Sequence, residues 1–248
     1  MKSTNNKINQ EKTLETIEIL HRDEIRNINL INFMKQYPIT TIGTVGDSIL
    51  VKGKSDENWI YISSENEEEF KGLLSSLNPD DQYFAIMEDW MLAILTKDRD
   101  VEWTLSCMKL YFPEDKPLPA LRLKAEALKP HEAEYIFNHY DYKQFTSVEY
   151  IVERINKGVA LGIYEGEQLV AWVITHDDGA IGFLTVLPEY RRKGYGYDLT
   201  IAAIEKLRQL GEVAFVHIEE ENIRSISLAE KTGFVKDRMI HWTKLTAK

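Results

Sequence analysis

A glycine-containing loop between a strand-like stretch and a helical stretch constrains this sequence more than any other feature. The residues from Leu184 to Gly196 read L-T-V-L-P-E-Y-R-R-K-G-Y-G, and a helical pattern follows at once. Gly194 and Gly196 let the chain turn tightly, so that successive backbone N–H groups point into one cavity, and the helix N-terminus adds a partial positive charge. The stretch therefore predicts a strand–loop–helix unit suited to a phosphate group.

A second motif follows downstream, where residues Asn222 to Phe234 read N-x-x-S-x-x-L-x-x-x-x-G-F. A lone G-x-G pair is usually only a turn, but two motifs in this order are specific. Together they resemble the acyl-CoA-binding motif and the last motif helix of the GNAT superfamily of N-acetyltransferases. The resemblance covers roughly residues 121–248, about half of the chain.

Composition narrows the class of protein further. A length of 248 residues leaves room for one large or two small domains, and a net charge of −10 would repel a phosphate backbone, so no nucleic-acid partner is expected. The single cysteine, Cys107, excludes an internal disulfide framework and a cysteine-cluster metal site, and we expect no metal. No apolar run approaches the roughly 20 residues that span a bilayer. The N-terminal residues also lack the apolar core of a secretory signal, so a cytoplasmic protein without a membrane partner is expected.

The first 112 residues alternate between helical and strand-like patterns and predict a smaller α+β lobe. Residues 1–12 are polar and expected to be frayed. Apolar spacing predicts helices over 13–25, 27–37 and 66–77, and strands over 39–45, 48–51, 59–63 and 101–112. Periodicity does not separate helix from strand over 84–95. We find no catalytic or ligand-binding motif in this part, whose residues are explained by core packing and a solvated surface.

Residues 113–119 hold three prolines and are the most linker-like stretch of the chain, so we predict domains over 1–112 and 120–248. In the second domain Thr146 and Glu149 form a capping box that opens a helix ending near Gly158. The other predicted elements are strands over 121–127, 159–164, 169–176, 180–186, 213–218 and 239–244, and helices over 130–140, from the loop to 210, and 223–231. This β-α-α-β-β-β-α-β-α-β order is the GNAT order and predicts an α+β fold with a mixed sheet.

A closer resemblance is to the glycine N-acyltransferase-like branch of that superfamily. The matching stretches are A-W-V-I-T-H-D-D-G, L-P-E-Y-R-R-K-G and V-H-I-E-E-E-N, with Trp242 near the end of the chain. This resemblance implies two lobes, of which the N-terminal one is a degenerate acetyltransferase shape. Only the C-terminal lobe would then be catalytic.

The resemblance also implies which residues bind acetyl-CoA. In the family the pantetheine arm lies along the strand before the loop, pyrophosphate is bound by the N–H groups of the loop, and an asparagine reaches the CoA from the next strand. The residues at these positions are Leu184, Thr185, Val186, Arg191, Arg192, Lys193, Gly194, Tyr195, Gly196, Tyr197 and Asn222. Tyr195 and Tyr197 are expected chiefly to pack the loop onto the helix.

The candidate catalytic residues are His217 and Glu219. In some GNAT enzymes a carboxylate five residues before the asparagine is the base, and His217 stands there with an ordinary pKa near 6.5. Glu219 shares its strand face and could orient it or act through water. A half-buried strand histidine without a catalytic role is an equally good interpretation. Two catalytic side chains of the family are missing. Ala229 stands where many members have a tyrosine as general acid, and Ala180 stands where the glycine N-acyltransferase-like branch has its base carboxylate.

These observations predict an acetyl-CoA-dependent N-acetyltransferase that acts by direct attack in a ternary complex on a primary amine of a small molecule or peptide. The missing tyrosine and carboxylate keep open a non-catalytic acyl-CoA-binding sensor. A structural two-lobed protein with a vestigial loop is a third interpretation, against which the intact Arg191, Gly194, Gly196 and Asn222 argue.

Overall fold

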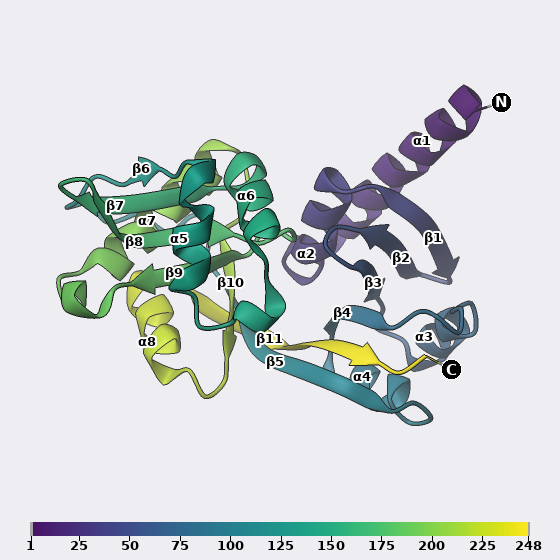
Figure 1. The fold of residues 1–248 in the computed structure, drawn as a ribbon. Helices are drawn as coiled ribbons and strands as arrows, with labels where there is room; N and C mark the ends of the chain where they lie inside the picture. Colours follow the sequence, from purple (N-terminus) through teal and green to yellow (C-terminus); the bar gives the residue numbers. More distant parts are fainter. Residues whose placement is uncertain (1, 248) are drawn as a thin grey trace. The chain divides into compact units, whose positions relative to one another are not determined.

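The structure, a computed structural model, describes residues 2–247, with side chains from residue 10 onward, and divides into two compact units. Unit 1 consists of Met1–Met108 and Arg238–Lys248, and unit 2 consists of Lys109–Asp237 (Figure 1). The chain passes from one unit to the other within strands β5 (Val101–Tyr111) and β11 (Val235–Leu245).

Unit 1 is built on a mixed sheet with the strand order β1-β2-β3-β4-β11-β5. Strands β3 and β4 run parallel, whereas β1–β2, β2–β3 and β4–β11 are antiparallel. Its elements before β5 are α1 (Lys2–Leu20), a 3₁₀ helix (His21–Asp23), α2 (Glu24–Gln36), β1 (Ile39–Val45), β2 (Ser48–Lys54), β3 (Asn58–Ser63), α3 (Glu67–Leu74), β4 (Tyr83–Met87) and α4 (Asp89–Leu95).

The alternating side chains of β2 explain why this sheet carries helices on both faces. Ile49 and Val51 belong to a buried cluster with residues of α1 and α2. Leu50, between them, belongs to a second cluster with residues of α3 and α4. Because successive strand residues point to opposite faces, an apolar run without polar alternation gives a strand that is buried on both sides.

Unit 2 has the strand order β10-β9-β8-β7-β6, in which only β9 and β10 run parallel. Its elements are β6 (Glu126–Ala127), a 3₁₀ helix (Pro130–Glu132), α5 (Ala133–Asn138), a 3₁₀ helix (Lys143–Phe145), α6 (Val148–Lys157), β7 (Ala160–Glu165), β8 (Gln168–Thr175), β9 (Ile181–Val186), a 3₁₀ helix (Pro188–Tyr190), α7 (Tyr195–Gln209), β10 (Phe215–Glu219) and α8 (Ile223–Thr232).

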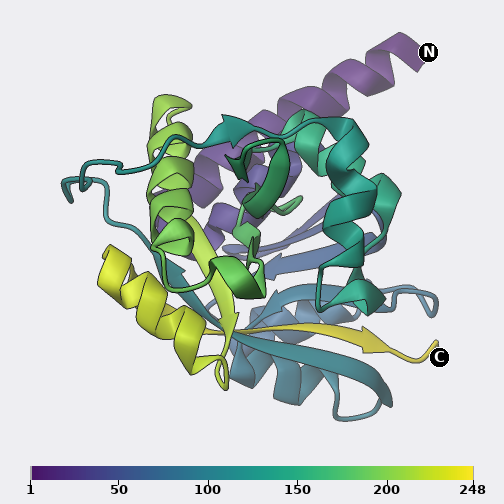
Figure 2. The same cartoon turned by 60° about the vertical axis from the view of Figure 1, so that its left-hand side comes forward.

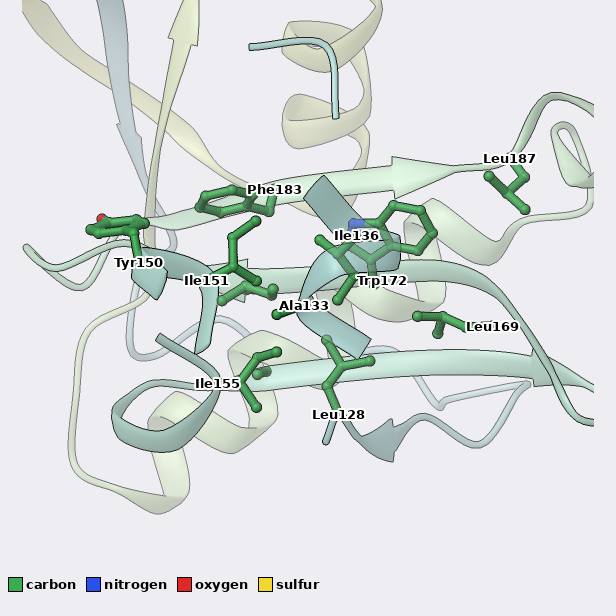
Figure 3. Close-up of a cluster of buried hydrophobic side chains, with 12 residues drawn as sticks. Leu128, Ala133, Ile136, Tyr150, Ile151, Ile155, Leu169, Trp172, Phe183 and Leu187 are labelled. Atoms are coloured by element: carbon green, nitrogen blue, oxygen red, sulfur yellow. The ribbon is translucent and has the colours of Figure 1, made fainter. Parts of the chain in front are cut away.

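Helices cover both faces of this sheet as well, with α7 on one side of β7–β9 and α5 and α6 on the other (Figure 2). Trp172 of β8 is 0% exposed and belongs to one buried cluster with Ile136 of α5 and Ile151 of α6 (Figure 3). Phe183 of β9 extends the cluster toward the end of α6 that carries Tyr150. Fully burying one such side chain contributes roughly 1.5–3 kcal/mol.

The order of elements repeats along the chain. Leaving the 3₁₀ helices aside, α1 to β5 and α5 to β11 both read α-α-β-β-β-α-β-α-β. The predicted α+β fold with a mixed sheet is confirmed, and the repeat agrees with the expectation that the N-terminal half is a second acetyltransferase-like lobe.

Four local predictions differ from the structure. Residues 2–12, expected to be frayed, form the first turns of α1, because no glycine or proline interrupts the helix before its buried end. Residues 84–95 contain both a strand and a helix, β4 and α4. The strand predicted over 121–127 is reduced to Glu126–Ala127. Helix α6 has Ser147 as its N-cap in place of Thr146, since the Ser147 hydroxyl accepts the Tyr150 N–H at 3.1 Å.

The units also differ from the domain limits proposed from the sequence, 1–112 and 120–248. Residues 238–248 group with unit 1, because β11 pairs with β4 through His241 and Met87. The proline-containing segment 113–119 groups with unit 2. There Arg208 of α7 donates to the carbonyl oxygens of Pro113, Glu114 and Lys116 at 2.8, 2.8 and 2.7 Å. A helix side chain thus satisfies backbone acceptors that a free linker would leave to water.

Candidate functional site

The loop between β9 and α7 has the backbone geometry of an anion cradle. Arg192 and Gly194 both adopt left-handed conformations, with φ of +66° and +92°. Alternation of left-handed and ordinary residues turns successive N–H groups toward a common point. Gly194 is the N-cap of α7 and has no side chain to bond the first N–H groups, whereas Ser147 and Asn222 cap α6 and α8 with side-chain oxygens. The N-terminus of this 15-residue helix is therefore suited to an external anion.

Side chains of the loop hold its shape from several directions. The Nε of Arg191 donates to the Val186 carbonyl at 3.0 Å, so this guanidinium ties the loop to the end of β9. Tyr195 is buried, and its hydroxyl donates to Glu165 at the end of β7. That hydrogen bond raises the pKa of Tyr195, which makes its hydroxyl a poor proton donor and favours the predicted packing role. Lys193 lies 4.7 Å from the centre of the Tyr190 ring.

Arg122 adds a positive charge that the sequence analysis did not find. Its Nε and Nη2 lie 3.2 and 3.3 Å from the two carboxylate oxygens of Asp198, a buried residue in the first turns of α7. Its guanidinium also lies beside Gly194 and 5.6 Å from the Tyr197 ring centre. The side chain is 61% exposed and thus remains accessible to a ligand. In the sequence it belongs to a stretch interpreted only as a strand.

A β-bulge shapes β9 just before the loop. Trp172 pairs with Thr185 and Ile174 with Gly182, so β9 has one residue more than β8 between these pairs. Phe183 lies in the bulge with φ +52° and stacks on Tyr140 with ring centres 4.5 Å apart. Of the predicted pantetheine-binding residues, Leu184 lies in the bulge beside Phe183, and Thr185 and Val186 follow it; all three are half-buried.

Strands β9 and β10 are joined near the start of each, where Ile181 pairs with Val216. The predicted base His217 lies on β10 directly after Val216, and the predicted Glu219 is the last residue of that strand. Asn222 begins α8, where its side-chain oxygen accepts the Ser225 N–H at 3.1 Å. His217 and Glu219 thus come from the strand parallel to β9, and Asn222 follows the end of that strand.

His217 lies in a buried polar cluster that the sequence did not reveal. Its Nδ1 is 3.9 Å from an oxygen of Asp178, and its ring meets that of Phe215 edge to face. The ammonium of Lys109 lies 5.9 Å from the Phe215 ring centre and 3.9 Å from a carboxylate oxygen of Asp237. Residues from four segments of unit 2 that are far apart in the sequence thus lie close together: β10, the turn after β8, the end of β5 and the start of β11.

Burial lowers the pKa of His217 to about 3, with further lowering from Lys109 and His176 and an opposing effect of Asp178. The imidazole is accordingly neutral throughout the physiological range. The expectation of a pKa near 6.5 is wrong, because that value describes a solvated histidine and this side chain is only 8% exposed. A neutral imidazole can accept a proton, but only while its environment stabilises the transient cation.

In unit 1, the connection between β3 and α3 lacks the glycine-containing loop that joins β9 and α7. Its counterpart of β9 and α7 is β3 and α3, joined by Ser64, Glu65 and Asn66 without a glycine. Asn66 accepts the N–H groups of Glu68 and Glu69, so the N-terminus of α3 already has a side-chain cap. Arg26 of α2 bonds to the Ser64 carbonyl at 2.9 Å and to Glu88, after β4, at 2.7 Å. The cap from Asn66 and the nearby carboxylates of unit 1 therefore make the N-terminus of α3 unsuited to a phosphate.

Among residues 2–247, no helix is long and apolar enough to cross a membrane. Within the same residues, no group of three or more histidine, cysteine, aspartate or glutamate side chains is placed to hold a metal ion.

Comparison with known proteins identifies the fold. A Drosophila protein from a structural genomics consortium matches with a TM-score of 0.79 and 16% identity over 96% of each chain. A GCN5-related N-acetyltransferase from Kribbella flavida matches with 0.56 and 14%, over 89% of this chain and 94% of its own. A GCN5-related N-acetyltransferase-like protein from Streptococcus suis matches with 0.55 and 11%, over 95% and 99%. The chain therefore has the fold of the GNAT acetyltransferases.

Residues 160–243, from β7 into β11, match the family model described as FR47-like protein. This match and the GNAT structures together support the GNAT superfamily. No curated protein sequence matches this chain at a significant level. The glycine N-acyltransferase-like branch stays a hypothesis.

Proposed function

We propose that this protein is an acetyl-CoA-dependent N-acetyltransferase that acts on a primary amine. The observation that carries the proposal is the uncapped N-terminus of α7 behind the left-handed Arg192 and Gly194. The bulged β9 leads directly into it, and the FR47-like match covers the whole arrangement. The residues present fit the phosphates of acetyl-CoA, because converging N–H groups, the helix dipole and Arg122 all favour an anion at one place.

Bound acetyl-CoA would supply a thioester that an amine attacks directly. In this proposal the N–H groups of residues 192–197 and the guanidinium of Arg122 hold the pyrophosphate, assisted by Arg192 and Lys193. The backbone of 184–186 aligns the pantetheine arm and offers an N–H to the carbonyl oxygen. Asn222, at the start of α8 just after the neighbouring strand, reaches the CoA.

Deprotonation of the amine is assigned to β10. His217 is neutral and accepts the proton, and Glu219 on the same strand face passes it toward water. Ala229, buried on α8, stands where family members have a tyrosine, so water returns a proton to the leaving thiolate. Direct attack in a ternary complex suits unit 2, because the chain's single cysteine, Cys107, lies in unit 1.

Calorimetric titration with acetyl-CoA tests the cofactor site. Gly194→Glu places a carboxylate in the cradle and should abolish binding. Gly211→Glu is the matched control, because Gly211 also has a left-handed φ, +72°, lies just beyond the other end of α7 and has open space around it. Binding by the native protein and the control, but not by Gly194→Glu, supports the site. Equal binding by all three, or no binding by the native protein, would overturn it.

An amine screen then separates the enzyme from a sensor. Release of free CoA thiol upon addition of an amine, with the acetylated amine detected by mass spectrometry, supports the transferase. The missing tyrosine at Ala229 favours the alternative of an acyl-CoA-binding sensor or regulatory module. Saturable acetyl-CoA binding without turnover on primary amines of any class would select that alternative.

A further inference from the structure

A serine, a histidine and an aspartate form a continuous hydrogen-bonded chain in unit 1. The Oγ of Ser106, on β5, lies 2.8 Å from Nδ1 of His241, on the neighbouring strand β11. Nε2 of the same ring lies 2.8 Å from Oδ1 of Asp89, the first residue of α4. All three residues belong to unit 1. The arrangement is that of a nucleophile, a base and a carboxylate that orients the base.

The order of these contacts determines which ring nitrogen of His241 carries hydrogen. An ionised carboxylate accepts hydrogen bonds and cannot donate one, so Asp89 requires the hydrogen on Nε2. In the neutral ring Nδ1 then has a lone pair, which accepts the Ser106 hydroxyl. Ser106 therefore has a base at hydrogen-bond distance, in the tautomer that can take its proton.

The burial of these side chains suits a reaction with a molecule from solution. The His241 side chain is only 9% exposed, which holds the ring between its two partners. Ser106 is exposed, so its side chain can be reached from outside. A serine that served only to satisfy a buried histidine would not need that exposure.

A β-bulge with an unusual backbone lies beside this chain of residues. Strand β4 has one residue more than β11 between two of their pairs, and Ile86 lies in this bulge. Its φ of +61° is a left-handed conformation that β-branched residues rarely adopt. Met87, the next residue, pairs with His241, and Asp89 follows two residues later. Bulges and strained residues of this kind are common next to active sites, where they re-aim side chains.

We propose that Ser106 is a nucleophile that takes acyl groups from activated esters, with His241 as its base and Asp89 as the residue that positions His241. The Ser106 oxygen bonds to the acyl carbon, and the bond from that carbon to the leaving group breaks. The hydroxyl proton passes to Nδ1 of His241 and from there to the leaving group. In a second step water attacks the acyl carbon, its proton returns through His241 to the Ser106 oxygen, and the free acid leaves.

The class of substrate follows from what this chain of residues acts on. It activates the nucleophile rather than the carbonyl oxygen of the substrate, so it suits esters whose leaving group departs easily, such as aryl esters and thioesters. The activity is separate from the amine acetylation proposed for unit 2 and uses none of its residues.

Thr104 provides an internal comparison. It lies two residues before Ser106, on the same face of β5, and is exposed as well. Its hydroxyl lies 3.0 Å from that of Thr243, which donates to the Trp103 carbonyl at 3.0 Å. Because the partner of Thr104 is another hydroxyl and not a base, we expect Thr104 to stay unreactive.

Acetylation of the full chain by p-nitrophenyl acetate tests the proposal, with nitrophenol release giving the rate and mass spectrometry locating the acetyl group. We expect an acetyl group on Ser106 and its loss in Ser106→Ala. Thr104→Ser is the matched control, because it places an equal hydroxyl on the same strand face without a histidine partner, and that hydroxyl should stay unmodified. Gly194→Glu, which disrupts the proposed acetyl-CoA site, should leave acetylation of Ser106 unchanged.

Asp89→Asn tests the positioning role. Its amide can donate to Nε2 and favour hydrogen on Nδ1, so acetylation of Ser106 should slow about tenfold or more. Asp80→Asn, at another exposed aspartate of unit 1, should have no effect. Asp89→Glu keeps the carboxylate and should recover most of the rate, a rescue that a merely structural role would not predict. His241→Gln removes the base and should slow the reaction about 10²-fold or more.

Three results would overturn the proposal. The first is an unmodified Ser106 in the native protein. The second is a native-like rate in Asp89→Asn, a variant expected to fold because the Asp89 side chain is 78% exposed. The third is acetylation of the new hydroxyl in Thr104→Ser as fast as that of Ser106.

Discussion

The buried, neutral His217 makes a quantitative prediction about acid stability. Its pKa is about 3 in the folded protein, against 6.5 for a solvated histidine. Above pH 6.5 the ring is neutral in both the folded and unfolded states, and its titration does not alter stability. Below pH 6.5, His217 binds a proton in the unfolded chain but not in the folded protein. The free energy of unfolding therefore falls as the pH falls, down to about pH 3.

The magnitude follows from the width of this window. Each pH unit inside it removes about 1.36 kcal/mol of unfolding free energy. Between pH 6.5 and 4.5 the histidine alone should therefore remove about 2.7 kcal/mol, a large share of the roughly 5–15 kcal/mol that stabilises an ordinary protein. His217→Gln removes the titration and keeps a polar side chain of similar size.

The assay is urea unfolding of the native protein and His217→Gln at pH 7.5, 6.5, 5.5 and 4.5, followed by circular dichroism. Other groups titrate in both proteins, so the difference between them isolates His217. We expect this difference to be constant above pH 6.5 and to shift in favour of the variant by about 2.7 kcal/mol at pH 4.5. His139→Gln, which removes an exposed histidine, is the control. Parallel curves for the native protein and His217→Gln would refute the reasoning.

Two further changes test other parts of unit 2. Arg122→Ala removes a cation beside the loop and should weaken acetyl-CoA binding about tenfold, the equivalent of one charge-assisted hydrogen bond. Lys124→Ala, which removes an exposed cation paired with Glu126, should leave binding unchanged, and an equal loss in both variants would contradict the assignment. Trp172→Ala should lower the free energy of unfolding by about 3–5 kcal/mol in urea titrations, and a loss below about 1 kcal/mol would contradict its central place in the core.

The elements of the fold and the loop were predictable because their signals are local. Gly194 and Gly196 after an apolar strand predict a tight strand–loop–helix turn, which the structure has, and period-2 or helical spacing places most strands and helices. The surroundings of His217 were not predictable, because they depend on Lys109 and Asp178 from other elements. The position of Arg122 beside the loop was not predictable for the same reason, since only the fold brings its partner Asp198 close to it.

The repeat of elements in the two units raises the question of how many acyl-CoA molecules one chain binds. The α3 N-terminus, equivalent to that of α7, is capped by Asn66 and followed by Glu67, Glu68 and Glu69. Binding of a phosphate there would break the hydrogen bonds of the Asn66 cap and bring the phosphate close to carboxylates that repel it. Arg26 offers no substitute, because Glu65 and Glu88 already neutralise it.

We therefore predict one acetyl-CoA per chain, with all binding lost in Gly194→Glu. Asn66→Ala removes the cap in unit 1 and, on this reasoning, should neither create a second site nor change the affinity of the first, because the carboxylates remain. Calorimetry of both variants gives the number of sites directly. A stoichiometry near two, or residual binding by Gly194→Glu that Asn66→Ala alters, would show that unit 1 has kept a binding site despite its altered loop.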